Sequence, residues 1–305
     1  MKNYSQLKGL IAAAFTPMDA AGKVNLSIIK SYAKLMIDTG LAGIFPCGTT
    51  GEFSSLTTDE RKQIAAAWVG HAKGKLKVIV HVGGNCQQQS IELAQHASEI
   101  GADGIAAIAP CFFKPQTTSD LIDFFVPVAA AAKEIPFYYY NMPAMTGVDL
   151  SVTEFLHEGK KRIPNLAGVK YTHNNLMEMA ECLHLDNKAF EVLHGYDEIL
   201  ITGIVLGAVA GVGSTYNYIP EIYTGIMEAM EKEDIQTARA LQLKSIEIVK
   251  IIIKYGGGVR GGKAIMKLMG IDCGLCRLPI KAFTDEEYKQ LDNDLKQISF
   301  FQNKK

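Results

Sequence analysis

The sequence contains a lysine in an unusual position for a charged side chain. Lys170 closes the apolar run Ala167-Gly-Val169, and burying an ammonium group without a partner is costly. A neutral lysine amine is a nucleophile that forms an imine with a ketone, yet under ~0.1% of an ordinary lysine is neutral at pH 7. Burial favours the neutral form, so a lysine at this point can act as a nucleophile. The alternative is a buried stem whose charged end reaches water.

A run of three tyrosines offers the proton carrier that imine chemistry needs. Residues 137–143 read Phe-Tyr-Tyr-Tyr-Asn-Met-Pro, and alternation along a strand sends Tyr138 and Tyr140 to one face and Tyr139 to the other. A tyrosine hydroxyl on a strand next to the lysine would accept and return protons. The alternative is ordinary packing of a ring whose hydroxyl is satisfied.

A hydroxyl-rich loop, Gly48-Thr49-Thr50-Gly51, follows another apolar run. Its backbone N–H groups and threonine hydroxyls can hold a carboxylate or a phosphate. Taken alone, the segment is equally consistent with an ordinary turn between a strand and a helix.

Other motifs argue against nucleotide and metal chemistry. Segment 257–263 has the spacing of a phosphate-binding loop, but Ala264 replaces the magnesium-binding Ser or Thr. It follows a long helical pattern at 246–255, so we expect a glycine-rich turn between helices. The seven histidines lack metal-binding spacing, although His81 and His194 lie near strand ends, where they could line a site. We therefore expect neither a metal nor a cofactor.

Composition restricts the class of protein and its partners. The chain has 305 residues, 48% of them hydrophobic, and its 31 basic and 32 acidic residues give a net charge of −1. This balance argues against a nucleic acid or an anionic membrane as a partner. The uncharged stretch 199–220 is long enough to span a bilayer, but its glycines divide it into a helical half, 199–206, and a strand-like half, 208–212. We expect a soluble, cytoplasmic protein.

The N-terminal segment and the cysteines fit the same interpretation. Lys2 and Lys8 precede an apolar run at 9–15, as in a signal peptide, but no small-residue cleavage site follows, which favours a buried first strand. Six cysteines in a chain of this size fit free thiols in a reducing compartment. Cys273 and Cys276 have redox or metal spacing, but no second pair follows, which favours a structural role.

Apolar runs of strand length alternate with helical patterns along most of the chain. Their continuous hydrophobicity is typical of strands covered on both faces. Thr57 with Glu60, and Ser151 with Glu154, have capping-box spacing, and Asn25 can cap a further helix. The predicted strands are 10–15, 43–46, 77–82, 104–108, 137–140, 167–170, 190–193 and 208–212.

Eight strands with intervening helices predict an α/β fold, a (β/α)8 TIM barrel, rather than an open sheet. After the eighth strand the pattern is helical, from about residue 220 to residue 297. We expect a catalytic barrel at 1–219 and a C-terminal helical extension at 220–305, packed together as a single structural unit. Active sites of such barrels lie at the carboxyl ends of the strands, where the lysine, the tyrosines and the threonine loop fall.

Three of these segments together resemble the motifs of a known family. Gly48-Thr-Thr-Gly-Glu52, Tyr140-Asn-Met-Pro143 and Lys170 are similar to those of the Schiff-base aldolases that include dihydrodipicolinate synthase and N-acetylneuraminate lyase. The resemblance extends through 213–217 into the helical tail. It implies a (β/α)8 barrel, usually a homotetramer, whose lysine forms an imine with pyruvate and whose tyrosine relays protons.

Within this family the sequence resembles the lyase branch. Ala144-Met145 stands where the synthases typically carry a Ser-Arg pair that binds a dicarboxylic partner, so that guanidinium clamp is missing. Gly195-Tyr-Asp197-Glu198 is similar to the sugar-binding stretch of the lyases, and its carboxylates suit sugar hydroxyls. The resemblance implies reversible cleavage of the sialic acid N-acetylneuraminate to N-acetyl-D-mannosamine and pyruvate, without a metal.

The resemblance also assigns roles to residues of this sequence. Lys170 would attack the ketone, and Tyr140 would move the proton of the C4 hydroxyl. Thr49 and Thr50 would hold the carboxylate at the pyruvate end. The residues expected to contact the sugar half are Thr172, Gly195, Asp197, Glu198 and Ser214.

One loop departs from the family pattern. Cys111-Phe112-Phe113 occupies a position where many members carry a tyrosine that reaches into a neighbouring subunit's site, and phenylalanine cannot relay a proton. Two alternatives stay open. The protein could be another pyruvate-dependent aldolase, dihydrodipicolinate synthase-like or acting on a 2-keto-3-deoxy sugar acid, or a catalytically silent sugar-acid sensor. The pair of Lys170 and Tyr140 favours an enzyme.

Overall fold

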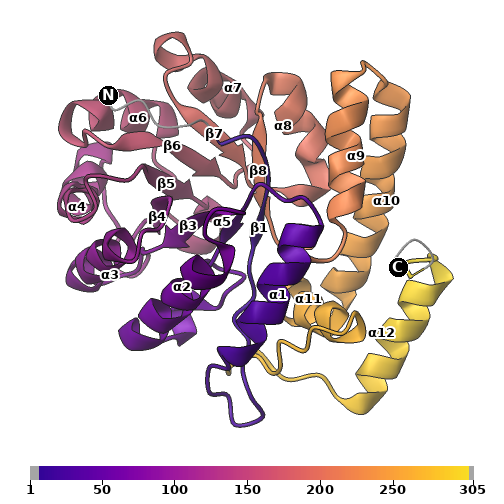
Figure 1. Ribbon diagram of the computed structural model, residues 1–305. Coiled ribbons are helices and arrows are strands. Elements are labelled where there is room, and N and C mark those ends of the chain that lie inside the picture. The colour runs from indigo at the N-terminus through magenta and orange to yellow at the C-terminus, as the bar shows by residue number, and fades with distance from the viewer. Residues whose placement is uncertain (1–6, 302–305) are drawn as a thin grey trace.

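Eight parallel strands close into a barrel in the computed structural model, which describes residues 7–301 (Figure 1). Each strand pairs with the next in chain order, and the eighth pairs with the first. The predicted (β/α)8 barrel is therefore confirmed. The strands are β1 (Gly9–Ala13), β2 (Gly43–Phe45), β3 (Lys77–His81), β4 (Gly104–Ile108), β5 (Phe137–Asn141), β6 (Leu166–Tyr171), β7 (Glu191–His194) and β8 (Ala210–Gly213).

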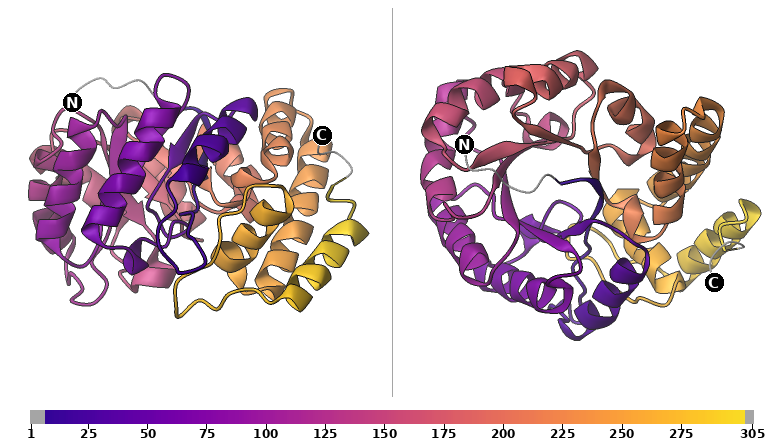
Figure 2. Two further views of the ribbon diagram at one scale, coloured as in Figure 1. Left: turned by 60° about the horizontal axis from the view of Figure 1, so that its bottom comes forward. Right: turned by 45° about the horizontal axis from the view of Figure 1, so that its top comes forward.

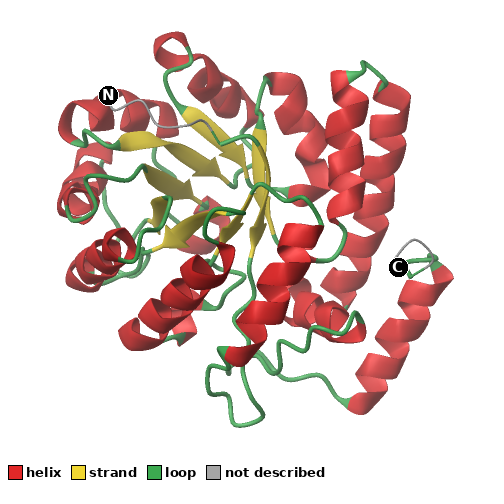
Figure 3. Cartoon of the chain, viewed as in Figure 1, coloured by secondary structure: helices red, strands yellow, loops and turns green. Residues whose placement is uncertain are grey.

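A helix follows each strand and covers the outside of the barrel, as the views in Figures 2 and 3 show. These helices are α1 (Ser27–Asp38), α2 (Thr58–Ala72), α3 (Gln87–Glu99), α4 (Thr118–Ala130), α6 (Val152–Arg162), α7 (Leu176–His184), α8 (Leu200–Leu206) and α9 (Pro220–Glu231). Shorter elements lie in the loops: α5 (Pro143–Thr146), η1 (Phe53–Ser55), η2 (Leu185–Asn187), η3 (Asp197–Ile199) and η4 (Thr215–Asn217).

The strands are continuously apolar because they separate two hydrophobic layers. Inside the barrel, Tyr138 and Tyr140 pack with side chains such as Phe45. Outside, the ring of Tyr139 packs on Phe155 of α6, with the ring centroids 4.7 Å apart. The predicted alternation of the three tyrosines is confirmed, and it brings the Tyr140 side chain into the barrel.

Two of the three predicted helix caps are formed. Thr57 Oγ1 accepts from the Glu60 backbone N–H at 3.2 Å, and Glu60 Oε2 accepts from the Thr57 N–H at 2.9 Å, so this capping box is formed. Ser151 Oγ accepts from the Glu154 N–H at 3.2 Å and starts α6. At α1 the prediction is off by one residue. Leu26 occupies the N-cap position, and Asn25 instead accepts from Ser27.

The expectation of a turn at 257–263 is wrong. The turn lies earlier, at Gly256, and α11 (Gly257–Leu268) contains the whole glycine-rich segment. The later glycines serve close packing, because a Cβ at Gly262 would lie 2.4 Å from the Phe15 ring and one at Gly261 would lie 2.9 Å from Ile252. Glycine here lets a helix approach the barrel.

Three more helices follow α9 and lie on one side of the barrel, with α12 outermost: α10 (Ile235–Lys254), α11 and α12 (Asp285–Gln297) (Figure 2). α9 contacts α8 and β1, and α10 packs along α9 and contacts α8, η3, α11 and α12. We propose that the barrel range, 1–219, and the range 220–305, which holds the eighth barrel helix α9 as well as the later helices, form a single structural unit because buried polar contacts join them. The outermost residues of both ranges, Lys2 among them, lie outside the described residues.

Between residues 7 and 301, no helix combines the length and hydrophobicity needed to cross a membrane. The uncharged stretch 199–220 divides into α8, β8 and η4, as its glycines predicted.

Candidate active site

A cavity of about 300 Å³ opens at the carboxyl ends of the barrel strands. All nine residues singled out in the sequence line it, although they come from five different strand ends. They are Thr49, Thr50, Tyr140, Lys170, Thr172, Gly195, Asp197, Glu198 and Ser214.

Lys170 and Tyr140 are neighbours because β5 and β6 pair in register at these two residues. The buried Lys170 Nζ lies 4.0 Å from the centre of the Tyr140 ring and 4.5 Å from the centre of the Phe45 ring. Among residues 7–301, Lys170 makes no ion pair. The amine therefore faces aromatic rings and the cavity, with no carboxylate bound to it.

The Tyr140 hydroxyl links the lysine to the threonine loop. Its oxygen lies 3.3 Å from Thr49 Oγ1, and it donates to the Met142 sulfur at 3.1 Å. Tyr140 and Thr49 are thus two hydroxyls between which a proton can pass, and the Lys170 amine lies beside them over the Tyr140 ring.

The loop that carries the threonines, residues 47–52, has a constrained backbone. Cys47 and Glu52 both have φ of 57°, a region that non-glycine residues seldom adopt. Thr16 Oγ1 donates to the Gly51 carbonyl at 2.7 Å and ties the loop to the end of β1. This backbone brings Thr49 and Thr50 to the cavity.

Asp197 occupies the opposite wall, in η3 after β7. Its Oδ2 accepts from the backbone N–H and the hydroxyl of Thr215, at 2.8 and 2.7 Å, whereas Oδ1 has no partner. Burial raises the pKa of this carboxyl to about 6. The folded state therefore holds the Asp197 proton more tightly than the unfolded chain. The stability that this binding contributes is complete below about pH 4 and is lost as pH rises through about 6.

Two glycines make room for the polar groups of this wall. A Cβ at Gly195 would lie 1.9 Å from Thr172 Oγ1, and one at Gly213 would lie 1.6 Å from Asp197 Oδ1. Thr172 Oγ1 is buried without a protein partner, like Asp197 Oδ1. Both atoms belong to residues of the cavity wall, so a bound ligand can supply the missing hydrogen bonds.

Sequence reasoning missed part of the wall. Tyr196 lines the cavity between two predicted residues, and its position in the stretch 195–198 could have revealed it. The helical extension supplies another side of the cavity. Its contributions are Val249, Ile252 and Ile253 of α10 and Gly258 and Val259 of α11, for which the glycine-rich segment was the only signal.

The two histidines near strand ends do not line the cavity. His81 Nδ1 lies 2.8 Å from the Cys47 carbonyl oxygen, and its pKa is lowered by burial and by the neighbouring Arg61, so the ring is neutral. His194 is buried beneath α8, where a Cβ at Gly203 would touch it, and burial lowers its pKa to about 4. Both are core residues.

Residues 144 and 145 also lie away from the main cavity. Ala144 is exposed, and Met145 borders a second cavity of about 170 Å³ that includes Thr49 and Cys111. Phe112 and Phe113 are 77% and 88% exposed, and their rings pack edge to face 5.0 Å apart. No hydroxyl from this loop reaches the site within this chain.

The described part of the chain holds no cluster of three or more His, Cys, Asp or Glu side chains suited to a metal ion. The six cysteines are all free thiols, including Cys273 and Cys276. Burial raises the pKa of these two thiols to about 12 and about 11, which disfavours the reactive thiolate.

A (β/α)8 barrel whose mouth holds a buried lysine, a tyrosine and a hydroxyl-rich loop defines the class of lysine-dependent barrel aldolases. The sequence matches the dihydrodipicolinate synthetase family over residues 6–298. The chain therefore belongs to this family.

Known relatives point to one branch of it. The N-acetylneuraminate lyase of Mus musculus is 42% identical over 299 residues, which cover 97% of this chain and 93% of the relative. The structure of the N-acetylneuraminate lyase from Aliivibrio salmonicida matches with a TM-score of 0.94 at 39% identity, covering 97% of this chain and 98% of the other. A sialic acid aldolase from Ruminococcus gnavus, solved as a catalytic lysine mutant, matches with a TM-score of 0.93 at 28% identity, covering 100% and 99%.

We predict that Gly213→Ala destabilises the protein by about 2–3 kcal/mol, because the new Cβ must displace the buried Asp197 carboxylate. Urea unfolding measures this loss. The matched control is Gly70→Ala on α2, where a Cβ meets nothing within 4 Å and helix propensity improves by up to about 1 kcal/mol. Wild-type stability in Gly213→Ala would contradict the geometry of this wall.

Proposed function

We propose that this protein is an aldehyde-lyase that reversibly cleaves N-acetylneuraminate to N-acetyl-D-mannosamine and pyruvate. The observation that carries the proposal is the pairing of Lys170 with Tyr140 across β5 and β6, in a cavity whose opposite wall presents Asp197 and Glu198. Its near full-length similarity to N-acetylneuraminate lyases supports the same reaction.

Catalysis begins at the ketone carbon of the open-chain sugar acid. Lys170 Nζ attacks this carbon, and loss of one water molecule gives a protonated imine. Thr49 and Thr50 hold the adjacent carboxylate through hydroxyls and backbone N–H groups, which places the ketone against the amine.

The carbon–carbon bond then breaks because the imine nitrogen accepts electrons. Tyr140 takes the proton of the C4 hydroxyl as its own proton passes to Thr49 Oγ1, 3.3 Å away, and the Thr49 proton passes to the substrate carboxylate that this threonine holds. The C4 oxygen forms the aldehyde of N-acetylmannosamine, and the bonding pair between C3 and C4 moves onto the imine to give an enamine. Tyr140 returns a proton to C3, and water hydrolyses the pyruvate imine.

The sugar half lies against the polar wall. Asp197 Oδ1 and Thr172 Oγ1 are buried without protein partners, and Glu198 and Ser214 line the same side. We propose that these groups, together with Gly195, which leaves room for Thr172, contact the sugar hydroxyls. The two carboxylates here accept hydrogen bonds from sugar hydroxyls and repel the carboxylates of a dicarboxylic partner.

The protonated imine serves as the electron sink, so we propose that the reaction needs neither a metal nor another cofactor. We propose a homotetramer in the cytoplasm, supported by the family resemblance, by the exposed pair of Phe112 and Phe113, and by the free thiols.

Substrate choice tests the function against the synthase alternative. We expect turnover of N-acetylneuraminate and negligible condensation of pyruvate with aspartate semialdehyde on the same preparation, because the described cavity offers carboxylates rather than a guanidinium at its aldehyde end. A preference for the semialdehyde would move the protein to the synthase branch. No turnover of either would favour the sensor.

Reductive trapping tests the nucleophile. Borohydride added with pyruvate should attach a lactyl-sized mass to the peptide that contains Lys170, as peptide mass spectrometry would detect. Lys170→Ala should abolish both the label and turnover. A label on a different lysine would refute the assignment.

Tyr140→Phe should lower kcat by roughly 10²–10⁴ because a proton carrier is lost. The ring remains, so stability should change by only about 1 kcal/mol. Tyr139→Phe is the matched control, since that ring faces the helices, and its kcat should stay near the wild-type value. A near-normal kcat in Tyr140→Phe would remove this residue from the mechanism.

The titration of Asp197 predicts a pH dependence. An ionised carboxylate accepts a sugar hydroxyl, and protonation below a pKa of about 6 removes that acceptor. The ratio of kcat/KM for wild type to that for Asp197→Asn should therefore be low near pH 5 and rise through pH 6. It should level off above pH 7 at roughly 5- to 150-fold. A ratio that is independent of pH would show that the charge is not used.

A further inference from the structure

The threonine loop is held from outside the barrel by a buried ion pair. Glu52 ends the loop, and its Oε1 lies 2.6 Å from Nζ of Lys263 on α11. The two side chains are 1% and 2% exposed, so neither charge is compensated by water. The Lys263 amine also donates to the Leu275 carbonyl at 2.8 Å.

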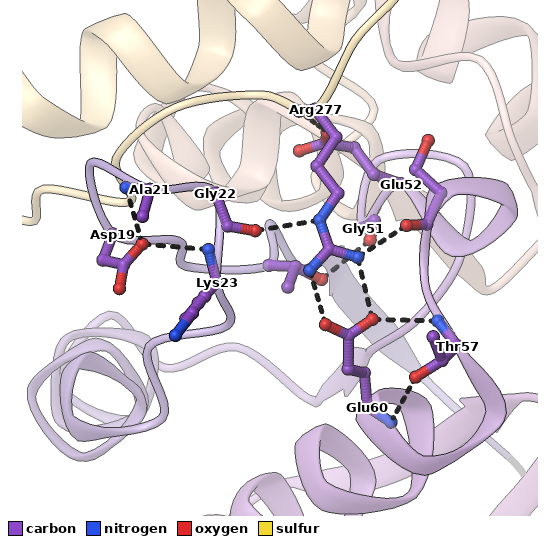
Figure 4. A network of polar contacts seen from close by, with 11 residues as sticks. Asp19, Ala21, Gly22, Lys23, Gly51, Glu52, Thr57, Glu60 and Arg277 are labelled. Carbon is purple, nitrogen blue, oxygen red and sulfur yellow. Dashed lines mark hydrogen bonds and ion pairs between the residues drawn. The ribbon is translucent and has the colours of Figure 1, made fainter.

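A second contact fixes the other oxygen of the same carboxylate. Glu52 Oε2 accepts from the Arg277 backbone N–H at 2.9 Å. The Arg277 side chain in turn bonds Glu60 at the start of α2 and the Gly22 carbonyl, at 2.8 and 2.9 Å (Figure 4). The left-handed backbone at Glu52 is thus held by α11 and by the segment that follows it.

The loop after β7, which carries Asp197 and Glu198, is held by a different residue, Gln242 of α10. Its buried amide nitrogen donates to the Asp197 carbonyl at 3.1 Å, and its oxygen accepts from the Ile201 N–H at 3.0 Å. No side chain of α8 caps that helix, so Gln242 supplies the acceptor. Ser245 completes the set by bonding the same amide nitrogen at 2.7 Å.

These two sets of contacts share no residue, and each reaches one half of the cavity. Lys263 acts on the loop of Thr49 and Thr50, and Gln242 acts on the loop of Asp197 and Glu198. We propose that the helical extension positions the two halves of the substrate independently, with Lys263 and Glu52 setting pyruvate affinity and Gln242 setting affinity for the aldehyde. This inference rests on the proposed function and identifies positioning residues for it.

The condensation direction separates the two halves experimentally. The apparent dissociation constant of pyruvate is measured from imine trapping on Lys170, and KM for N-acetylmannosamine is measured at saturating pyruvate. The first variant is Glu52→Gln with Lys263→Met, which removes the ion pair without leaving a lone buried charge. The second is Gln242→Met, which keeps length and removes the hydrogen bonds.

We expect a crosswise result. The double variant should weaken pyruvate binding by about tenfold or more, because a small displacement of a binding loop is costly, with KM for N-acetylmannosamine changed less than about threefold. Gln242→Met should raise KM for N-acetylmannosamine by about tenfold or more and change the apparent dissociation constant of pyruvate less than about threefold. The matched controls are Lys267→Met, an exposed lysine on the same helix, and Gln236→Met, an exposed glutamine of α10; both should leave the two constants unchanged.

Equal changes of both constants in either variant, or lower stability with both constants unchanged, would overturn the proposal and leave these contacts a structural role alone. If circular dichroism finds the double variant unfolded, Glu52→Asp, which keeps the charge and both acceptor oxygens but shortens the side chain by one methylene, is measured by the same criterion. Failure of the wild type to form the imine or to cleave N-acetylneuraminate would instead refute the proposed function.

Discussion

The site depends on a lysine amine that lies inside a barrel mouth without a carboxylate partner. An ion pair would occupy the amine and compete with the substrate carbonyl for it, whereas Lys170 faces the rings of Tyr140 and Phe45. The closed barrel makes this possible because the register of β5 with β6 sets the lysine beside the tyrosine that must serve it. A one-residue shift of either strand would turn Lys170 or Tyr140 from the barrel interior to the helix layer.

Around this centre, the polar groups divide between two loops of opposite character. The loop after β2 offers hydroxyls and N–H groups, which suit a carboxylate, and its positive φ angles at Cys47 and Glu52 need support from neighbours. The loop after β7 offers the Asp197 carboxylate, of which one oxygen accepts from Thr215 and the other is buried without a hydrogen-bond partner. A substrate with a carboxylate at one end and hydroxyls at the other matches this arrangement.

The helices after β8 are part of the same arrangement. α10 and α11 line the cavity and contribute Gln242 and Lys263, which bond the two loops. Gly262 lets α11 come close to Phe15, and Gly261 lets it pack on Ile252 of α10. This packing brings Lys263 within reach of Glu52. Helical segments outside the barrel thereby take part in shaping its mouth.

The sequence by itself determined the strands and two helix starts, because hydrophobic periodicity and capping pairs are local signals. Strand-end positions indicated Lys170, Tyr140 and the threonine loop, and the family resemblance supplied the other candidate residues. The sequence also predicted the barrel, in which the carboxyl ends of the strands meet at one mouth. Only the tertiary structure decided that 257–263 is a helix, that His81 and His194 are core residues, and that Asp197 is bonded to Thr215. The partners Glu52 and Lys263 are 211 positions apart, and no local pattern encodes a contact of that range. Such contacts form only when the whole chain packs. The sequence therefore identified the candidate side chains of the site, and the fold determined their distances and burial.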